Sequence, residues 1–230
     1  MEVVVPLAGP DFERSDGSTK AEMLINGQPL LTQALWSRSW WRHGAVTAPD
    51  FCFVLRDTPV ARRFAEGALA DWFPGARHVF LSHATAGAAF SAAAGVALCD
   101  PSAPVCIDLA DILYHDDLDA TEAFAVNERL GGIALTFSSD RPVYSYLRLD
   151  AQERVVEAAE KRVISAHASA GTYFFRDAGV YARALGHAVA HRESQTYRGV
   201  YFVCPLFNGV IDCGFDVRHA AVSDIVDIKI

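Results

Sequence analysis

The chain opens on the apolar run Val3-Val4-Val5-Pro6-Leu7-Ala8-Gly9, which predicts a short parallel strand buried on both faces. Two groups of turn-forming residues follow, Gly9-Pro10-Asp11 and Ser15-Asp16-Gly17-Ser18, so we expect residues 9–19 to form a loop at the carboxyl edge of the sheet. Open α/β sheets bind ligands at that edge. Exposed backbone N–H groups and Lys20 would form an anion cradle there, although an ordinary loop between a strand and a helix fits the same residues.

The rest of the chain alternates strand-like and helix-like segments and then changes character. The strand-like runs of the first half lie at 51–55, 78–81 and 105–109, and the helical patterns lie at 30–43, 59–72 and 85–98. This alternation predicts a mostly parallel sheet with right-handed crossovers. The second half has strand-like runs joined by short polar turns, which indicate antiparallel additions, at 132–138, 144–150, 155–159 and 172–175. With a last helix at 178–191, the expected fold is an α/β domain over residues 1–230, a mixed sheet flanked by helices.

Composition limits the class of protein more than its chemistry. A chain of 230 residues that is 51% hydrophobic can bury one substantial core. The net charge of −8 argues against a nucleic-acid surface, which would be basic. Neither a signal peptide nor an apolar run of membrane length is recognisable, so we expect a cytoplasmic location and no membrane partner. The five cysteines include no CxxC pair and indicate reduced, buried thiols.

Two aspartates flank the end of the predicted strand at 105–109. Asp108 and Asp111 are three residues apart and would point to opposite faces while strand geometry lasts, so we expect one of them to face a ligand. Asp111 lies beyond the apolar run, where a carboxylate suits Mg²⁺. An acidic loop that caps a helix fits the same residues. The eight histidines show no HExxH spacing and the chain has no Gly-x-Ser-x-Gly, so neither a zinc site nor a serine nucleophile is expected.

Several short motifs occur in a fixed order in the middle of the chain. They include Ser145-Tyr146, Val155-Val156-Glu157, the segment at 160–165 and Gly171-Thr172-Tyr173, and further motifs lie at 85–88 and 205–208. In this order they resemble the sugar-phosphate nucleotidyltransferase-like family, which has a GT-A-type Rossmann fold and occurs in capsule and lipopolysaccharide biosynthesis. The resemblance runs over nearly the whole chain. It implies a single-domain nucleotidyltransferase-like fold and an enzyme that joins a nucleoside triphosphate to a phosphorylated sugar or similar small molecule.

The resemblance implies a nucleotide site in the loop after the first strand. The residues expected at the phosphates are Leu7, Ala8, Gly9, Arg14 and Lys20. Lys20 would stabilise charge that develops on the α-phosphate, and Arg14 would replace the family's loop arginine from a displaced position. The loop departs from the family pattern G-x-G-[ST]-R, because the second glycine is missing and Asp11 and Glu13 add negative charge.

A metal site and a base or sugar site are implied as well. Asp111 matches the metal aspartate of the family's strand-end G-D segment, and Asp227 resembles the second metal aspartate, although the family's G-T does not follow it. Both would hold Mg²⁺. Thr85 and Gly87 would lie near the base or the sugar.

On the acceptor side, the resemblance implies that Glu160 contacts the sugar and that Lys161 holds the acceptor phosphate, with Gly171 and Asn208 also at the substrate. A substrate phosphate would attack the α-phosphate in line and pyrophosphate would leave. Lys20, Lys161 and Mg²⁺ would offset the repulsion between the two anions.

The sequence is also compatible with two other functions. The altered loop at 9–19 suits a non-catalytic module that binds a sugar nucleotide. A GT-A glycosyltransferase with a sugar-nucleotide donor would use Asp108 and Asp111 as its metal pair. We expect Trp36, Trp40 and Trp41 to belong to the core, with one of the three rings exposed. An exposed ring could instead lie at an interface between copies of the chain, so a homo-oligomer is a further possibility.

Overall fold

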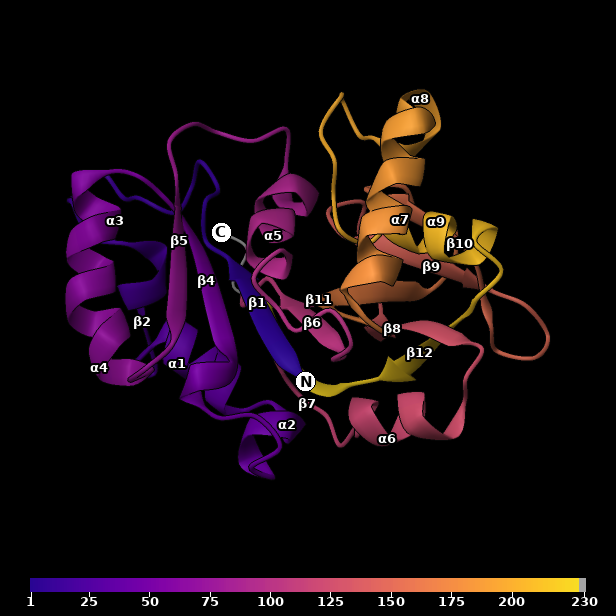
Figure 1. The fold of residues 1–230 in the computed structure, drawn as a ribbon, viewed down its shortest axis with the longest axis horizontal. Helices are drawn as coiled ribbons and strands as arrows, with labels where there is room; N and C mark the ends of the chain where they lie inside the picture. The colour runs from indigo at the N-terminus through magenta and orange to yellow at the C-terminus, as the bar shows by residue number, and fades with distance from the viewer. Residues whose placement is uncertain (228–230) are drawn as a thin grey trace.

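Within residues 1–227, the part of the chain that the computed structural model describes, nine strands form one mixed sheet (Figure 1). Seven of them follow the order β10-β9-β11-β6-β1-β4-β5, while β8 pairs with β11 and β12 pairs with β8. These strands are β1 (Glu2–Pro6), β4 (Phe51–Arg56), β5 (Arg77–Leu81), β6 (Val105–Asp108), β8 (Leu130–Ser138), β9 (Ser145–Leu149), β10 (Val155–Glu160), β11 (His167–Phe175) and β12 (Asp216–Ala221). β1 runs parallel to both β4 and β6, and β4 runs parallel to β5, so the predicted parallel half of the sheet is confirmed.

The helices cover both faces of this sheet, in the layered arrangement predicted from the sequence (Figure 1). They are α1 (Leu30–Trp36), α2 (Ser39–Arg42), α3 (Pro59–Phe64), α4 (Ala70–Trp72), α5 (Ala88–Val96), α6 (Ala120–Val126), α7 (Ala178–Ala190), α8 (Arg192–Gln195) and α9 (Leu206–Asp212). Two 3-10 turns, η1 (Lys20–Glu22) and η2 (Ala48–Asp50), and one π-helical segment, η3 (Ala65–Leu69), complete the list. Helices α5, α7 and α9 pack on one face, and α1, α3 and α6 pack on the other.

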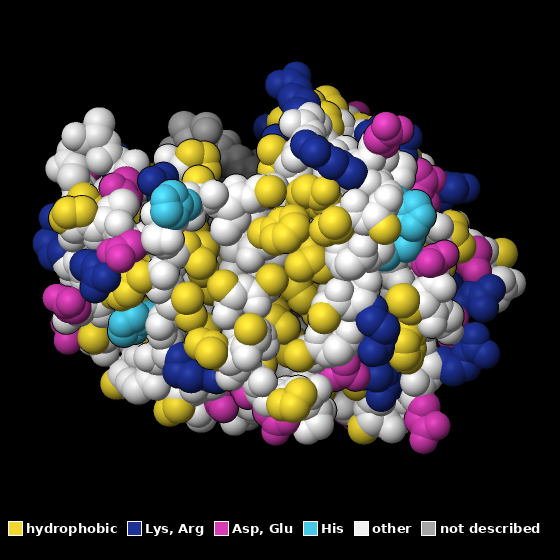
Figure 2. All heavy atoms as spheres, turned by 45° about the horizontal axis from the view of Figure 1, so that its top comes forward, with side chains coloured by type: hydrophobic (Ala, Val, Ile, Leu, Met, Phe, Trp, Pro, Cys, Tyr) yellow, Lys and Arg dark blue, Asp and Glu magenta, His cyan; other side chains and the backbone are white. Residues whose placement is uncertain are grey.

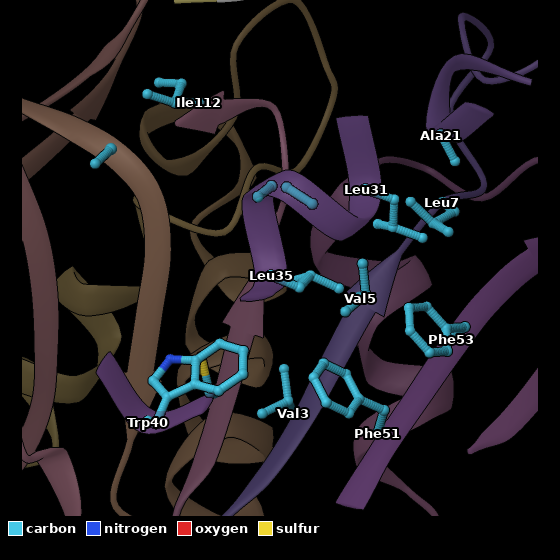
Figure 3. Close-up of a cluster of buried hydrophobic side chains, with 14 of the residues drawn as sticks. Val3, Val5, Leu7, Ala21, Leu31, Leu35, Trp40, Phe51, Phe53 and Ile112 are labelled. Atoms are coloured by element: carbon cyan, nitrogen blue, oxygen red, sulfur yellow. The ribbon is translucent and has the colours of Figure 1, made fainter. Parts of the chain in front are cut away.

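The opening strand is buried on both faces, as its uniform apolar run predicts. Val3, Val4 and Val5 have no exposed surface. Figure 3 shows Val3 and Val5 on the side of the sheet that faces α1, close to Phe51 and Phe53 of β4. Val4 packs on the opposite side, in the cluster that contains the buried side of α5. A strand that is covered on both faces needs apolar residues at every position, and this explains why the pattern does not alternate.

The second half of the sheet is antiparallel, which confirms the predicted change of character. β11 pairs antiparallel with β6, β8 and β9, and β10 pairs antiparallel with β9. β11 begins at His167, five residues before the predicted run at 172–175. Its register shifts between Ser169 and Tyr173, where Gly171 adopts a φ of +83°. This bulge interrupts the alternation of side chains, so the sequence pattern does not indicate that residues 167–171 belong to the strand.

Helix 30–43 was expected to be continuous, and the structure divides it. α1 ends at Trp36 and α2 begins at Ser39, because Arg38 adopts an extended backbone with φ −65° and ψ 143°. Trp40 is buried, whereas Trp36 is 43% exposed and stacks on Trp41 with ring centroids 6.4 Å apart. The expectation of a mostly buried cluster with one exposed ring is therefore confirmed.

Two small antiparallel ribbons lie outside the main sheet. β2 (Leu24–Ile25) pairs with β3 (Gln28–Pro29), and β7 (Ile112–His115) pairs with β13 (Ser223–Asp227). The sequence pattern predicts none of the strands β7, β12 and β13. β12 and β13 are mixed in polarity, and the apolar run of β7 is only three residues long, from Ile112 to Tyr114.

One face of the molecule carries an apolar groove. Figure 2 shows apolar side chains gathered across its middle, and the groove is lined by residues of α5 and α7, among them Phe90, Ala93, Tyr181 and Leu185. None of the predicted site residues lines it. Among residues 1–227, no helix combines the length and the apolar character needed to cross a bilayer. The five cysteines are free thiols, and four of them are buried, as predicted.

Candidate active site

The predicted nucleotide and metal residues follow parallel strands at one edge of the sheet. β1 and β6 are neighbours, with Val3 opposite Cys106 and Val4 opposite Ile107. The loop after β1 and the turn that contains Asp111 after β6 therefore emerge at the same edge. The loop that contains Thr85 follows β5, whose carboxyl end lies at this edge too. This is the edge where open α/β sheets bind ligands.

The loop after β1 is ordered by its own side chains. The N–H of Leu7 donates to the carbonyl of Val54 over 2.7 Å, which extends the pairing past the strand. Phe12 is buried and meets the ring of Phe64 edge-on, with centroids 5.7 Å apart. The hydroxyl of Thr58 donates to the Glu13 carboxylate over 2.6 Å. The departures from the family pattern thus have a structural use, because Phe12 and Glu13 attach the loop to α3 and its N-cap.

Both cations of this loop pair with aspartates of the same loop. The ammonium of Lys20 donates to the Asp11 carboxylate over 2.9 Å, and the Arg14 guanidinium lies 3.5 Å from Asp16. The Lys20 side chain is 28% exposed and Asp11 is 70% exposed, so this ion pair faces solvent. A β-carbon on Gly9 would come within 2.9 Å of the Asp11 carboxylate. Any phosphate that approaches Lys20 must therefore compete with Asp11.

Thr85 and Gly87 form the entry to α5. The hydroxyl of Thr85 donates to the carbonyl of Gly87 over 2.9 Å and lies 2.7 Å from the hydroxyl of Ser91. Gly87 has a φ of +133°, and a β-carbon there would lie 2.3 Å from the carbonyl oxygen of Tyr201. The N–H of Tyr201 donates to the carbonyl of Ala86 over 2.9 Å. Glycine at position 87 is required because the backbone of another segment lies against it.

We expect Gly87→Ala to lower the free energy of unfolding by about 2–5 kcal/mol, since the side chain adds both backbone strain and a collision with Tyr201. Urea unfolding followed by circular dichroism measures this change. The matched control is Gly186→Ala in α7, where a β-carbon would meet no atom within 4 Å. That control should raise stability by about 0.5–1 kcal/mol. Equal stability of Gly87→Ala and the wild type would contradict the contact.

Asp108 is committed to a buried ion pair and does not face a ligand. Its side chain is 1% exposed, and the Arg38 guanidinium donates to its two oxygens over 2.8 and 3.1 Å. The N–H of Ala110 and the hydroxyl of Thr172 donate to the same carboxylate over 2.8 and 3.0 Å. The choice of Asp111 over Asp108 is consistent with this geometry. A metal pair of Asp108 and Asp111, which the glycosyltransferase alternative uses, would require Asp108 to leave its ion pair with Arg38.

Asp111 lies beside the bulge of β11. A β-carbon on Gly171 would come within 3.1 Å of an Asp111 carboxylate oxygen, and the N–H of Leu109 donates to the carbonyl of Gly171 over 3.0 Å. The predicted metal aspartate and the predicted substrate glycine are therefore in contact range. The backbone of Asp227 pairs with Ile112, the residue after Asp111, whereas the Asp227 side chain lies outside the described part of the structure. The pairing of β7 with β13 thus places the backbone of Asp227 next to the residue that follows Asp111.

The residues at this turn fit a magnesium ion. A carboxylate oxygen is the ligand type that Mg²⁺ prefers, and Mg²⁺ commonly binds one or two carboxylates together with substrate phosphates and water. Among the side chains that the structure describes, no group of three or more His, Cys, Asp or Glu is arranged to hold a metal. An ion held by Asp111, together with Asp227 as the resemblance implies, would complete its coordination with water and phosphates. Asp119, and not Asp111, caps the next helix, α6, where it accepts from the N–H of Glu122.

Glu160 is the last residue of β10, and Lys161 follows it. Glu160 pairs with Ser145 across the ladder, and the hydroxyl of Ser145 donates to its carboxylate. In β11, the hydroxyl of Ser169 donates to Tyr173 over 2.8 Å and accepts from the N–H of Gly171 over 3.1 Å. Burial raises the pKa of Tyr173 well above its ordinary value, so its hydroxyl stays neutral. This polar row leads from β11 toward the predicted sugar-binding carboxylate.

Lys161 lies between two aromatic rings that the sequence reading did not single out. Its ammonium is 5.5 Å from the centroids of both Tyr197 and Phe202. The backbone of Lys161 has a φ of +50°, and its N–H donates to the carbonyl of Tyr144 over 3.0 Å. Aromatic faces attract a cation and orient it without neutralising its charge. The aromatic pair is 36 or more residues away in the chain, so no local motif indicates it.

The amide of Asn208 joins α9 to β10. Its nitrogen donates to the carbonyl of Ala158 over 2.9 Å and to Gln195 over 2.8 Å, and its oxygen accepts from the N–H of Ala158 over 2.8 Å. Two strong bonds to one strand residue fix the position of β10 against the helix. Asn208 therefore supports the strand that ends in Glu160, and its direct contact with substrate stays a prediction.

Comparison with known proteins gives the fold its context. No protein-family model and no curated protein matches the sequence. Many solved structures match the chain, among them three that cover nearly all of it. A nucleoside-diphosphate-sugar pyrophosphorylase from Vibrio cholerae RC9 has a TM-score of 0.80 and 18% identity, covering 99% of this chain and 95% of that one.

A protein from Bacillus anthracis assigned as a glucose-1-phosphate thymidylyltransferase has a TM-score of 0.72 and 15% identity, covering 99% of this chain and 89% of that one. The inositol-1-phosphate CTP transferase from T. maritima has a TM-score of 0.69 and 16% identity, covering 98% of this chain and 86% of that one. Each match extends from the parallel half of the sheet through the antiparallel half. The chain therefore has the α/β fold of the nucleoside-diphosphate-sugar pyrophosphorylases and sugar nucleotidyltransferases.

Proposed function

We propose that this protein is a Mg²⁺-dependent, cytoplasmic nucleotidyltransferase for surface-polysaccharide biosynthesis. It transfers a nucleoside monophosphate unit from a nucleoside triphosphate to a sugar phosphate or related phosphorylated metabolite and releases pyrophosphate. The observation that carries the proposal is that the loop ending in Lys20 and the turn with Asp111 follow neighbouring parallel strands, β1 and β6. The segments that contain a lysine and a carboxylate therefore follow strands that end at the same edge of the sheet.

The reaction requires alignment of two anions. An oxygen of the acceptor phosphate attacks the α-phosphorus of the triphosphate, a new P–O bond forms, and the bond to the β-phosphate breaks as pyrophosphate leaves. A phosphate oxyanion is already nucleophilic, so no general base is needed. Lys20 stabilises charge on the α-phosphate, and Lys161 holds the acceptor phosphate, oriented by its two aromatic neighbours. Bound Mg²⁺ supplies further charge neutralisation at Asp111 and Asp227.

The remaining predicted residues have supporting roles in this proposal. Glu160 contacts the acceptor sugar, Thr85 and Gly87 lie near the base or the donor sugar, and Arg14 approaches the phosphates from the loop. The residues whose backbone surrounds the nucleotide or substrate are Leu7, Ala8, Gly9 and Gly171, and Asn208 holds the acceptor strand.

A thermal-shift screen with the four nucleoside triphosphates and common sugar nucleotides, each with and without Mg²⁺, tests the proposal. A ligand at 100 times its Kd stabilises the folded state by about 2.7 kcal/mol, which raises the Tm of a chain this size by about 5–10 °C. A Mg²⁺-dependent shift with one triphosphate is the expected result and identifies the base. The absence of a shift with every triphosphate would count against the proposal.

A second candidate function is a non-catalytic module that binds a sugar nucleotide. The observation that favours it is the ion pair between Lys20 and Asp11, which occupies the cation expected at the α-phosphate. The same screen separates the two functions. Shifts with sugar nucleotides alone, and with no triphosphate, would favour the module.

We expect Asp11→Asn to strengthen triphosphate binding, because it removes the carboxylate that competes with phosphate for Lys20. An exposed ion pair contributes at most about 1 kcal/mol, so KM for the triphosphate should fall by about two- to fivefold. Steady-state kinetics of pyrophosphate release measure the change. Asp16→Asn, which alters the other aspartate paired in this loop, is the matched control and should leave KM within about twofold. An increase of KM in Asp11→Asn would show that the carboxylate assists binding.

A further inference from the structure

Arg38 is a buried cation far in sequence from the predicted metal turn that contains Asp111. It occupies the break between α1 and α2, and its side chain has no exposed surface. The guanidinium makes a two-point contact with Asp108, which lies 70 residues later at the end of β6. Two parallel bonds of this kind fix the direction of a carboxylate as well as its distance.

The same guanidinium also contacts the strand that follows the predicted metal turn. Its Nη2 donates to the carbonyl of Ile112 over 3.1 Å, and its centre lies 3.7 Å above the ring of Tyr114. Ile112 and Tyr114 both belong to β7, and Ile112 pairs with Asp227 in β13. Arg38 therefore holds the residues on either side of Asp111, through Asp108 before it and Ile112 after it.

The segment between these two contacts has a backbone that needs support. Ala110 adopts a φ of +52°, a left-handed conformation that is unfavourable for a residue with a β-carbon. The Asp108 carboxylate accepts from the N–H of Ala110 over 2.8 Å and from the hydroxyl of Thr172 over 3.0 Å. An unfavourable backbone persists where its surroundings determine it from several sides. Here the carboxylate supplies that support, and Arg38 fixes the carboxylate.

We infer that Arg38 is a positioning residue for the metal site, which holds the turn at 109–112 and thereby the Asp111 carboxylate. The inference rests on the proposed function insofar as it takes Asp111 as a metal ligand. A buried ion pair adds little net stability over apolar residues of the same volume, because both charges lose water. Its contribution here is to geometry. Outer residues that orient a ligand typically change metal affinity by about 10–100-fold when replaced.

The test compares Mn²⁺ binding, measured by electron paramagnetic resonance, in the wild type and Arg38→Lys. Lysine keeps the charge but cannot donate to both Asp108 oxygens and to Ile112 together. We expect the Kd for Mn²⁺ to rise by about 10–100-fold while circular dichroism shows a folded chain. The matched control is Arg154→Lys, which changes an exposed pair with Asp150 at 2.8 Å and should leave the Kd unchanged.

Thr172→Val is the second variant, because it removes one bond to Asp108 and leaves Arg38 in place. It should weaken Mn²⁺ binding by less than Arg38→Lys does. Weaker binding in Arg38→Lys, together with an inactive wild type, would reject the proposed reaction and leave the inference standing. Wild-type Mn²⁺ affinity in folded Arg38→Lys, or in Thr172→Val if Arg38→Lys does not fold, would overturn the inference. No Mn²⁺ binding by the wild type would overturn it as well.

Discussion

Asp111→Asn is expected to lower kcat/KM for Mg²⁺-dependent pyrophosphate release by about 10³-fold or more. The variant keeps the size of the side chain and removes the charge that would hold the cation at the α-phosphate, a contribution of several kcal/mol to the transition state. Steady-state kinetics over a range of Mg²⁺ concentrations measure the loss. The Tm should change little, because the ion pair that stabilises this turn belongs to Asp108.

The control for this prediction is Asp117→Asn. Asp117 lies six residues later, its side chain is 75% exposed, and it is 3.4 Å from Arg42. This variant should keep kcat/KM within about twofold of the wild type, as expected for a surface ion pair. Equal activity of Asp111→Asn and the wild type would remove Asp111 from the metal site.

Arg38→Met is expected to produce the largest loss of stability. The variant fills the same space and leaves the Asp108 carboxylate buried without its cation, which typically costs about 3–5 kcal/mol. For a chain of this length, we expect the Tm to fall by about 6–20 °C. Differential scanning calorimetry measures this change, and the free energy follows from urea unfolding.

The comparison variant for this prediction is Arg62→Met. Arg62 also makes a two-point contact, with Asp57 over 2.6 and 3.0 Å, but its side chain is 49% exposed. Solvent screens an exposed pair, so its loss should cost no more than about 1 kcal/mol. Equal losses of unfolding free energy in the two variants would show that burial of the Arg38–Asp108 pair does not determine its contribution to stability.

The sequence predicts the central strands well because a strand that is buried on both faces has a recognisable run of apolar residues. The runs at 3–7 and 51–55 are apolar at successive positions, and the run at 105–109 is apolar except at Asp108, as strands covered on both faces require. The corresponding β1, β4 and β6 lie within a residue or two of those bounds. The short polar turns of the second half predict its strands β8, β9, β10 and β11 in their order along the chain. The predicted start of β11, at residue 172, is five residues too late.

The elements that the sequence reading missed depend on contacts between distant residues. β7 and β13 contain aspartate, histidine and serine, and they are strands because they pair with each other across more than a hundred residues. The break between α1 and α2 has a comparable origin, since Arg38 turns inward to reach Asp108. An arginine set among the tryptophans of an apolar helical pattern, as Arg38 is, is the signal that would have indicated a buried partner.

The candidate site divides in the same way. Motifs indicate Asp111, Glu160 and Lys161, because those residues follow recognisable strands. Their surroundings come from the fold alone. Tyr197 and Phe202 reach Lys161 from a distant segment, and no spacing along the chain indicates that they flank it.

The most direct test of the account is mass spectrometry of the products formed from each nucleoside triphosphate with a panel of sugar 1-phosphates. The account predicts one sugar nucleotide and one pyrophosphate per turnover, formed only with Mg²⁺ and lost in Asp111→Asn. Sugar nucleotides that bind without being formed from any triphosphate, or that are cleaved to a nucleoside diphosphate, would contradict it.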